Sequence, residues 1–213
     1  MVQAGIVGKI GFNSSSVGVC LNAIRARPTD KKFLPVHLIL RLLLEQPSFS
    51  SALALMSTLG GCASSQHILL ASSSGSRGLE VSPRGTIYLP EDSLGLVVHT
   101  NHFLENRLVE EPPWLSGSPV RLERAKMLCA GLVKRHGGEE GQVITPALLR
   151  HQVFADTFNS PQAICCAPDP SREESVETLF NIIMMFEEGN EPRAEVVFGR
   201  PTNPKSKVYR IPQ

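Results

Sequence analysis

The segment HTNH, residues 99–102, follows two valines and precedes a phenylalanine, so four hydrogen-bonding side chains interrupt an apolar run. Imidazole and carboxamide groups can bind a metal or stabilise charge during catalysis. A zinc site needs three or four ligands, and no other histidine or cysteine is paired nearby, so we expect no metal. An amide donor aimed at a developing oxyanion can accelerate a reaction by about 10²–10³-fold. The spacing alone favours a strand end whose side chains satisfy backbone groups, and it leaves catalysis by Asn101 open.

The composition places the chain among soluble globular proteins. It has 213 residues, of which 42% are hydrophobic and 19% are charged, and its formal net charge is +1. No basic run suggests a nucleic-acid partner, and the longest apolar stretch, residues 38–44, is too short to span a membrane. Five cysteines without a spacing pattern suit a reducing compartment. We therefore expect a cytoplasmic protein without a cofactor.

The elements that must position these residues can be predicted from periodicity and turn chemistry. Paired strands are predicted at 4–12 and 17–21, and helices at 35–45 and from Ser48 or Ser50 to Leu59, with Gly60 as a left-handed cap. Further strands are expected near 66–72, 77–82, 85–89, 94–99, 176–186, 193–198 and 207–211. Further helices are expected at 119–135 and from 145 to about 155. Hairpins alternating with blocks of helix predict an α+β fold with antiparallel sheets.

Seven stretches in order resemble the isopenicillin N acyltransferase family, also called acyl-coenzyme A:6-aminopenicillanic acid acyltransferases, of the N-terminal-nucleophile (Ntn) hydrolase superfamily. They are AGIVGKIGFNSSSVGVCLNAIR (4–25), LPVHLILRLLLE (34–45), GLEVSP (78–83), VVHTNHF (97–103), RLERAKML (121–128), TLFNIIMMF (178–186) and VVFGRPTNP (196–204). The resemblance implies a four-layer αββα sandwich. It also implies a self-processing precursor whose freed cysteine forms an acyl-enzyme, with its own α-amine as base. Carried over by motif, Asn101 stabilises the oxyanion, which makes the segment a catalytic strand end.

The resemblance covers the later two-thirds of a family member. The nucleophilic cysteine of the family lies upstream of the first matched stretch, so residues 1–213 are expected to form a single incomplete Ntn-hydrolase domain. Cys166 stands where family members commonly carry an arginine, and a thiol cannot replace a guanidinium. The pair Gly61-Cys62 looks like a self-cleavage junction but is better explained by a helix terminus. His102, Glu80 and Cys166 are candidates for the substrate pocket.

Two functional hypotheses stay open. The first is an acyltransferase or amidohydrolase that takes an acyl group from a thioester or amide small molecule and whose remaining segment lies elsewhere. The second is a catalytically inactive, truncated or degenerate relative that acts, if at all, as a binding partner of a missing N-terminal segment or a paralogue. A chain lacking part of its fold would expose sheet edges, so we expect poor solubility when it is expressed alone.

Overall fold

The structure is a computed structural model that describes residues 8–113, 117–136, 143–171 and 176–212. The chain forms two compact units. The first comprises Met1–Trp114 and Met184–Pro192, and the second comprises Leu115–Ile183 and Arg193–Gln213.

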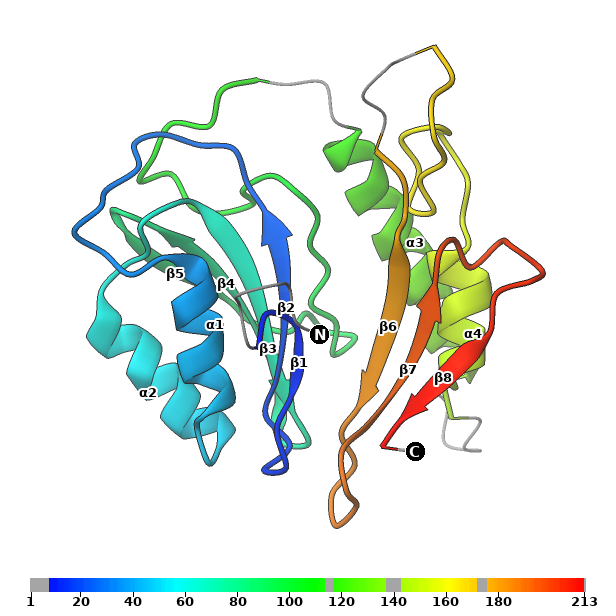
Figure 1. The fold of residues 1–213 in the computed structure, drawn as a ribbon, viewed down its shortest axis with the longest axis horizontal. Coiled ribbons are helices and arrows are strands. Elements are labelled where there is room, and N and C mark those ends of the chain that lie inside the picture. Colours follow the sequence, from blue (N-terminus) through cyan, green and yellow to red (C-terminus); the bar gives the residue numbers. More distant parts are fainter. Residues whose placement is uncertain (1–7, 114–116, 137–142, 172–175, 213) are drawn as a thin grey trace. The chain divides into compact units, whose positions relative to one another are not determined.

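The first unit contains a five-stranded antiparallel sheet in the order β1-β2-β3-β4-β5 (Figure 1). Its strands are β1 (Gly11–Phe12), β2 (Gly18–Ala23), β3 (Gln66–Ser72), β4 (Gly75–Ser82) and β5 (Gly85–Leu89). Successive side chains of a strand point to opposite faces. The apolar residues of β2, β3 and β4 alternate accordingly, and one face of the sheet carries Val19, Ile68, Leu70, Leu79 and Val81.

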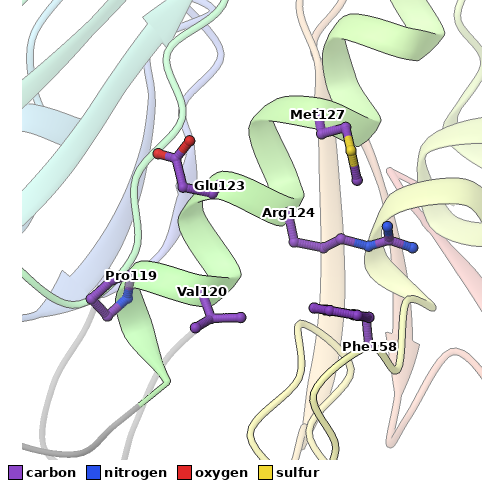
Figure 2. A pocket seen from close by; sticks show the side chains of 6 residues that line it. All are labelled: Pro119, Val120, Glu123, Arg124, Met127 and Phe158. Atoms are coloured by element: carbon purple, nitrogen blue, oxygen red, sulfur yellow. The ribbon is translucent and has the colours of Figure 1, made fainter.

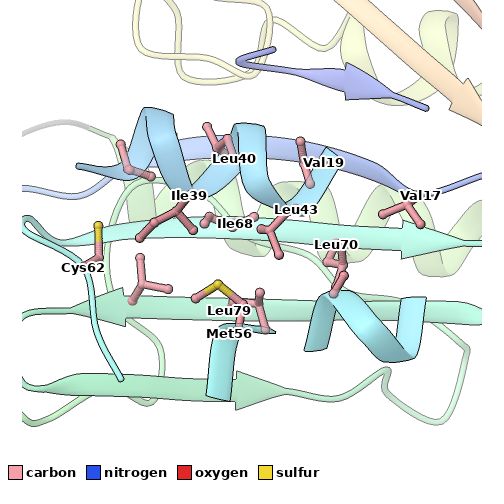
Figure 3. Packing of buried hydrophobic residues seen from close by; sticks show 13 residues of the cluster. Val17, Val19, Ile39, Leu40, Leu43, Met56, Cys62, Ile68, Leu70 and Leu79 are labelled. Carbon is pink, nitrogen blue, oxygen red and sulfur yellow. The ribbon is translucent and has the colours of Figure 1, made fainter. Parts of the chain in front are cut away.

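Two helices cover this apolar face (Figure 1). Helix α1 (Val36–Leu44) begins after Pro35 and contributes the buried residues Ile39, Leu40 and Leu43. Helix α2 (Phe49–Leu59) begins at Ser48, whose side chain forms a capping box with Ser51, and ends at Gly60 with φ of 68°. Figure 3 shows the helix side chains packed among the strand residues. The helical stripe and the alternating strands thus form one core.

Within the described residues, the second unit contains three helical pieces and a sheet in the order β6-β7-β8, apart from the last two residues of β6. The elements are β6 (Phe180–Met185), β7 (Arg193–Phe198), β8 (Val208–Ile211), α3 (Ser118–His136), α4 (Pro146–Leu149) and a π-helical turn, Arg150–Phe154, that continues α4. Thr145 caps α4 by accepting the N–H of Leu148. Arg150 is buried and donates to the Glu195 carboxylate, which joins the π-helical turn to β7.

The α+β class with antiparallel sheets is confirmed. The strand predicted at 94–99 is wrong, so residues 99–102 are not a strand end. Asp92 accepts the amides of Leu94 and Leu96 and turns the chain there, at Gly95 with φ of 72°. The strand predicted at 176–186 begins only at Phe180. The start of the hairpin predicted from residue 4 lies outside the described residues.

No helix in the described part of the chain is both long enough and apolar enough to cross a membrane. The four-layer sandwich and the single-domain organisation stay predictions.

Candidate functional site

The face of the first sheet opposite the helices carries a row of three polar residues. In the strand register Asn22 of β2 pairs with His67 of β3, and His67 pairs with Glu80 of β4. Paired residues of adjacent antiparallel strands project to the same face. The register of β2, β3 and β4 therefore aligns Asn22, His67 and Glu80 in one row. The segment that carries residues 99–106 lies against it, since both His99 and Asn106 contact Glu80.

Glu80 is completely buried, and its carboxylate collects four donors. Nε2 of His99 lies 2.9 Å from Oε1, and the amide of Leu104 donates to the same oxygen. The amides of Glu105 and Asn106 donate to Oε2 at 3.0 and 2.7 Å. Burial raises the pKa of the Glu80 carboxyl, but the hydrogen bonds from His99 and from the three amides outweigh it, and the pKa is lowered overall. The buried group is therefore a carboxylate.

Two imidazole rings stack beside this carboxylate. The centroids of His67 and His99 are 3.6 Å apart, and the ring planes differ by 5°. Both nitrogens of His99 face oxygens that can only accept, because Nδ1 lies 2.8 Å from the Thr100 carbonyl and Nε2 faces Glu80. This geometry favours a His99 ring that carries both protons.

The second ring of the stack is neutral. Nδ1 of His67 lies 2.9 Å from Oδ1 of Asn22, an acceptor, so the proton belongs on Nδ1. Burial and then the nearby His99 lower the pKa of His67 to about 2. A charged His99 on the carboxylate and a neutral His67 stacked on it make one consistent arrangement.

Asn101 is half-buried on the segment between these anchors. Its Nδ2 donates to the backbone carbonyl of Ala23 at 3.0 Å. Ala23 ends β2 and comes directly after Asn22, which belongs to the polar row. His102 is half-buried too, and its Nδ1 lies 3.4 Å from Oγ1 of Thr100. The structure thus brings together three of the predicted site residues, Asn101, His102 and Glu80, in one unit.

Asn101 does not line either of two surface cavities in the described part of the chain. The first, of about 500 Å³, belongs to the second unit and is bounded by one side of α3 and by Phe158. Figure 2 shows its lining side chains, with the Arg124 guanidinium over the Phe158 ring, 5.1 Å from its centroid. The second cavity, of about 710 Å³, belongs to the first unit. Its lining includes Arg27, four residues beyond Ala23, together with Arg84 and Glu110.

The family comparison agrees with the motif. The family described as acyl-coenzyme A:6-aminopenicillanic acid acyl-transferase matches residues 2–203. The chain belongs to this family. A curated relative, the 40 kDa form of acyl-coenzyme A:6-aminopenicillanic-acid-acyltransferase from Emericella nidulans, is 34% identical over 206 residues. That match covers 96% of this chain and 54% of the relative, so the chain spans about half the length of the curated relative.

Cys166, the remaining predicted site residue of this acyltransferase-family chain, lies in the second unit. Its thiol donates to the carbonyl of Val176 at 2.9 Å, and its amide donates to Oγ1 of Thr178 at 3.0 Å. Burial raises the pKa of Cys166, and the nearby positive charge of Arg121 only partly offsets this. The residue is held as a thiol in a loop.

The other cysteines with a perturbed pKa are no more reactive. Burial raises the pKa of Cys20 to about 11 and raises those of Cys62 and Cys129 as well. Cys62 is fully buried in the core just after the α2 cap at Gly60, which agrees with a helix terminus and not a cleavage junction. In the described part of the chain, no cluster of three or more histidine, cysteine or acidic side chains is placed to hold a metal.

Sequence reasoning missed two members of the site, Asn22 and His67. Each lies next to an apolar run of its strand, GVCLNA for Asn22 and QHILLAS for His67. A buried polar residue needs a hydrogen-bond partner. A polar residue beside an apolar run of a strand was therefore the sequence signal for Asn22 and His67.

Proposed function

We propose that the chain forms the oxyanion-stabilising part of an acyltransferase of the Ntn type, in which acyl transfer passes through a cysteine acyl-enzyme. The observation that carries the proposal is the way in which the fold holds the Asn101 side chain in place. Its amide nitrogen bonds to the end of β2, and the segment around it is anchored on a buried carboxylate. A donor held on rigid elements is what a preorganised oxyanion site needs. Family membership supports the same reaction class.

The reaction requires a thiolate that attacks the carbonyl carbon of a thioester or amide. A carbon–sulfur bond forms, and the carbonyl electron pair moves onto the oxygen, to which Asn101 donates a hydrogen bond. A carboxamide nitrogen carries two N–H groups, each of which can donate a hydrogen bond. Collapse of the intermediate expels the leaving group, which takes up a proton. An acceptor amine, or water, then attacks the acyl-enzyme, loses its proton and regenerates the thiol.

We assign the attacking thiol to a polypeptide segment other than these 213 residues. A nucleophilic cysteine needs a lowered pKa or an adjacent base. Burial raises the pKa of four cysteines of this chain, namely Cys20, Cys62, Cys129 and Cys166. The fifth, Cys165, is almost fully buried, and its Sγ lies 3.6 Å from Oγ1 of Thr202, a hydroxyl and not a base.

The test compares the protein, purified from the cells that make it, with its Asn101→Ala variant. Phenylacetyl-coenzyme A is the donor and 6-aminopenicillanic acid the acceptor. Released coenzyme A is measured by chromatography, and the acyl-enzyme by intact mass. We expect Asn101→Ala to lower kcat by about 10²–10³-fold with KM little changed, because the donor acts in the transition state. Asn190→Ala is the matched control, since Asn190 lies in an exposed turn.

Equal rates for Asn101→Ala and the unmodified protein would refute the role of Asn101. If the unmodified protein shows neither coenzyme A release nor an acyl adduct, the proposed enzymatic activity is refuted. The alternative, a catalytically inactive relative that acts as a binding partner, would then fit the observations.

A further inference from the structure

Asn101 lies between two attachments to the same carboxylate. Two residues before it, His99 donates to Oε1 of Glu80. A few residues after it, the amides of residues 104–106 donate to both oxygens of that carboxylate. The side chain of Asn106 adds a bond from Nδ2 to the Glu80 backbone carbonyl at 3.1 Å. The path of residues 100–103 is therefore fixed at both ends by one residue of β4.

The acceptor of the Asn101 side chain is fixed by the same sheet. Ala23 is the neighbour of Asn22, and Asn22 contacts His67, which stacks on His99. Glu80 is paired with His67 in the register of β3 and β4. The Asn101 backbone and the carbonyl that its side chain binds thus both depend on the polar row.

We infer that Glu80 is the positioning residue of Asn101: its carboxylate, by binding His99 on one side and three backbone amides on the other, sets where the Asn101 carboxamide points. Glu80 itself does not reach solvent, so it acts through the segment and not on a substrate. The inference rests on the proposed function for the catalytic importance of Asn101. The anchoring is a property of the first unit alone.

Replacing the carboxylate by an amide is a sharp test of this anchoring. In Glu80→Gln the charge is lost, and an NH₂ group must face at least one of the donors that now converge on the carboxylate. A buried donor without an acceptor is costly, so the segment should open more often. Glu91→Gln is the matched control. Glu91 also accepts a backbone amide and a hydroxyl of β4, from Ser76 at 2.6 and 2.7 Å, but at an exposed site.

The experiment uses the isotope-labelled full chain without substrate and measures hydrogen exchange of the Asn101 Nδ2 protons by NMR. We expect exchange to rise about tenfold or more in Glu80→Gln, the order set by the loss of one charge-assisted hydrogen bond. It should not change in Glu91→Gln, and the amides of β3 should stay protected in both. Should Glu80→Gln fail to fold, His99→Phe takes its place, because phenylalanine keeps a ring stacked on His67 but removes the hydrogen bond to Glu80, and the same rise in Asn101 exchange is expected.

Unchanged Asn101 exchange in a folded variant would overturn the inference. An equal rise throughout the sheet would overturn it as well, because that result describes general destabilisation and not positioning. If the acyltransferase assay succeeds, Glu80→Gln should lower kcat by about 10²-fold with KM retained, the loss expected from a small misplacement of a catalytic group. If the unmodified protein shows no acyl transfer, the proposed function fails while the exchange result still decides the anchoring.

Discussion

A methyl group added at Gly78 should displace the His67 ring of the histidine stack. Gly78 lies on β4 two residues before Glu80, on the face that carries the polar row. A Cβ built there would lie 2.9 Å from Nε2 of His67, 3.1 Å from Cβ of Leu89 and 3.2 Å from Cγ1 of Val97. Contacts under 3.0 Å do not persist, so a neighbour must move. The His67 ring cannot move freely, because one of its faces lies against His99.

Gly78→Ala should therefore lower the free energy of unfolding by about 1–2 kcal/mol. Overpacking of a filled interior costs about 1–3 kcal/mol. The substitution also restricts the unfolded chain, which offsets about 0.4–1 kcal/mol. Gly131→Ala in helix α3 should have the opposite sign. There the nearest atom is the flexible end of Arg135, at 3.2 Å, and alanine is favoured over glycine in a helix by up to about 1 kcal/mol.

Urea unfolding monitored by circular dichroism measures both changes, and NMR of the two imidazole rings reports the stack directly. We expect Gly78→Ala to shift the ring signals of His67 and His99, and Gly131→Ala to leave them in place. If the Gly78→Ala protein is as stable as the unmodified chain and its ring signals are unchanged, His67 does not pack closely against Gly78.

Two further predictions concern buried ionisable side chains. The pKa of His67 is about 2 in the folded chain against 6.5 for a free ring, so below pH 6.5 the unfolded chain binds a proton that the folded chain does not. Stability should fall with decreasing pH by up to about 1.4 kcal/mol per unit. Urea titrations between pH 6.5 and 4.5 should show this slope reduced in His67→Phe but kept in the exposed-site variant His151→Gln; equal slopes would contradict it. Arg150→Ala should cost about 3 kcal/mol by leaving Glu195 without its main partner. Arg41→Ala, which breaks an exposed ion pair, should change the thermal unfolding temperature little, and a similar loss in both variants would contradict the prediction.

Local chemistry predicted the elements that it controls. Ser48 and Gly60 bound helix α2 as expected, because a hydroxyl cap and a left-handed glycine act within a few residues. Thr145 begins α4 in the same way. The strands predicted near 66–72 and 77–82 are present as β3 and β4.

Long-range contacts decided what the sequence could not predict. The run LGLVVH has the pattern of a strand, but Asp92 turns the chain within it and Glu80 binds His99 at its end. The polar row depends on pairing between residues far apart in the chain, since Asn22 and His67 are 45 positions apart. Asn101 could be singled out by its motif, whereas its anchoring on Glu80 required the register of the sheet.

The row of Asn22, His67 and Glu80 has a consequence for how the first sheet assembles. A slip of β3 by one position would turn every side chain to the opposite face, so the apolar residues themselves oppose it. A slip by two positions would keep the apolar side chains beneath α1 and α2 but would separate His67 from Asn22 and Glu80. The three polar side chains thereby select one alignment among those that the apolar residues accept, and they do so before any substrate is present.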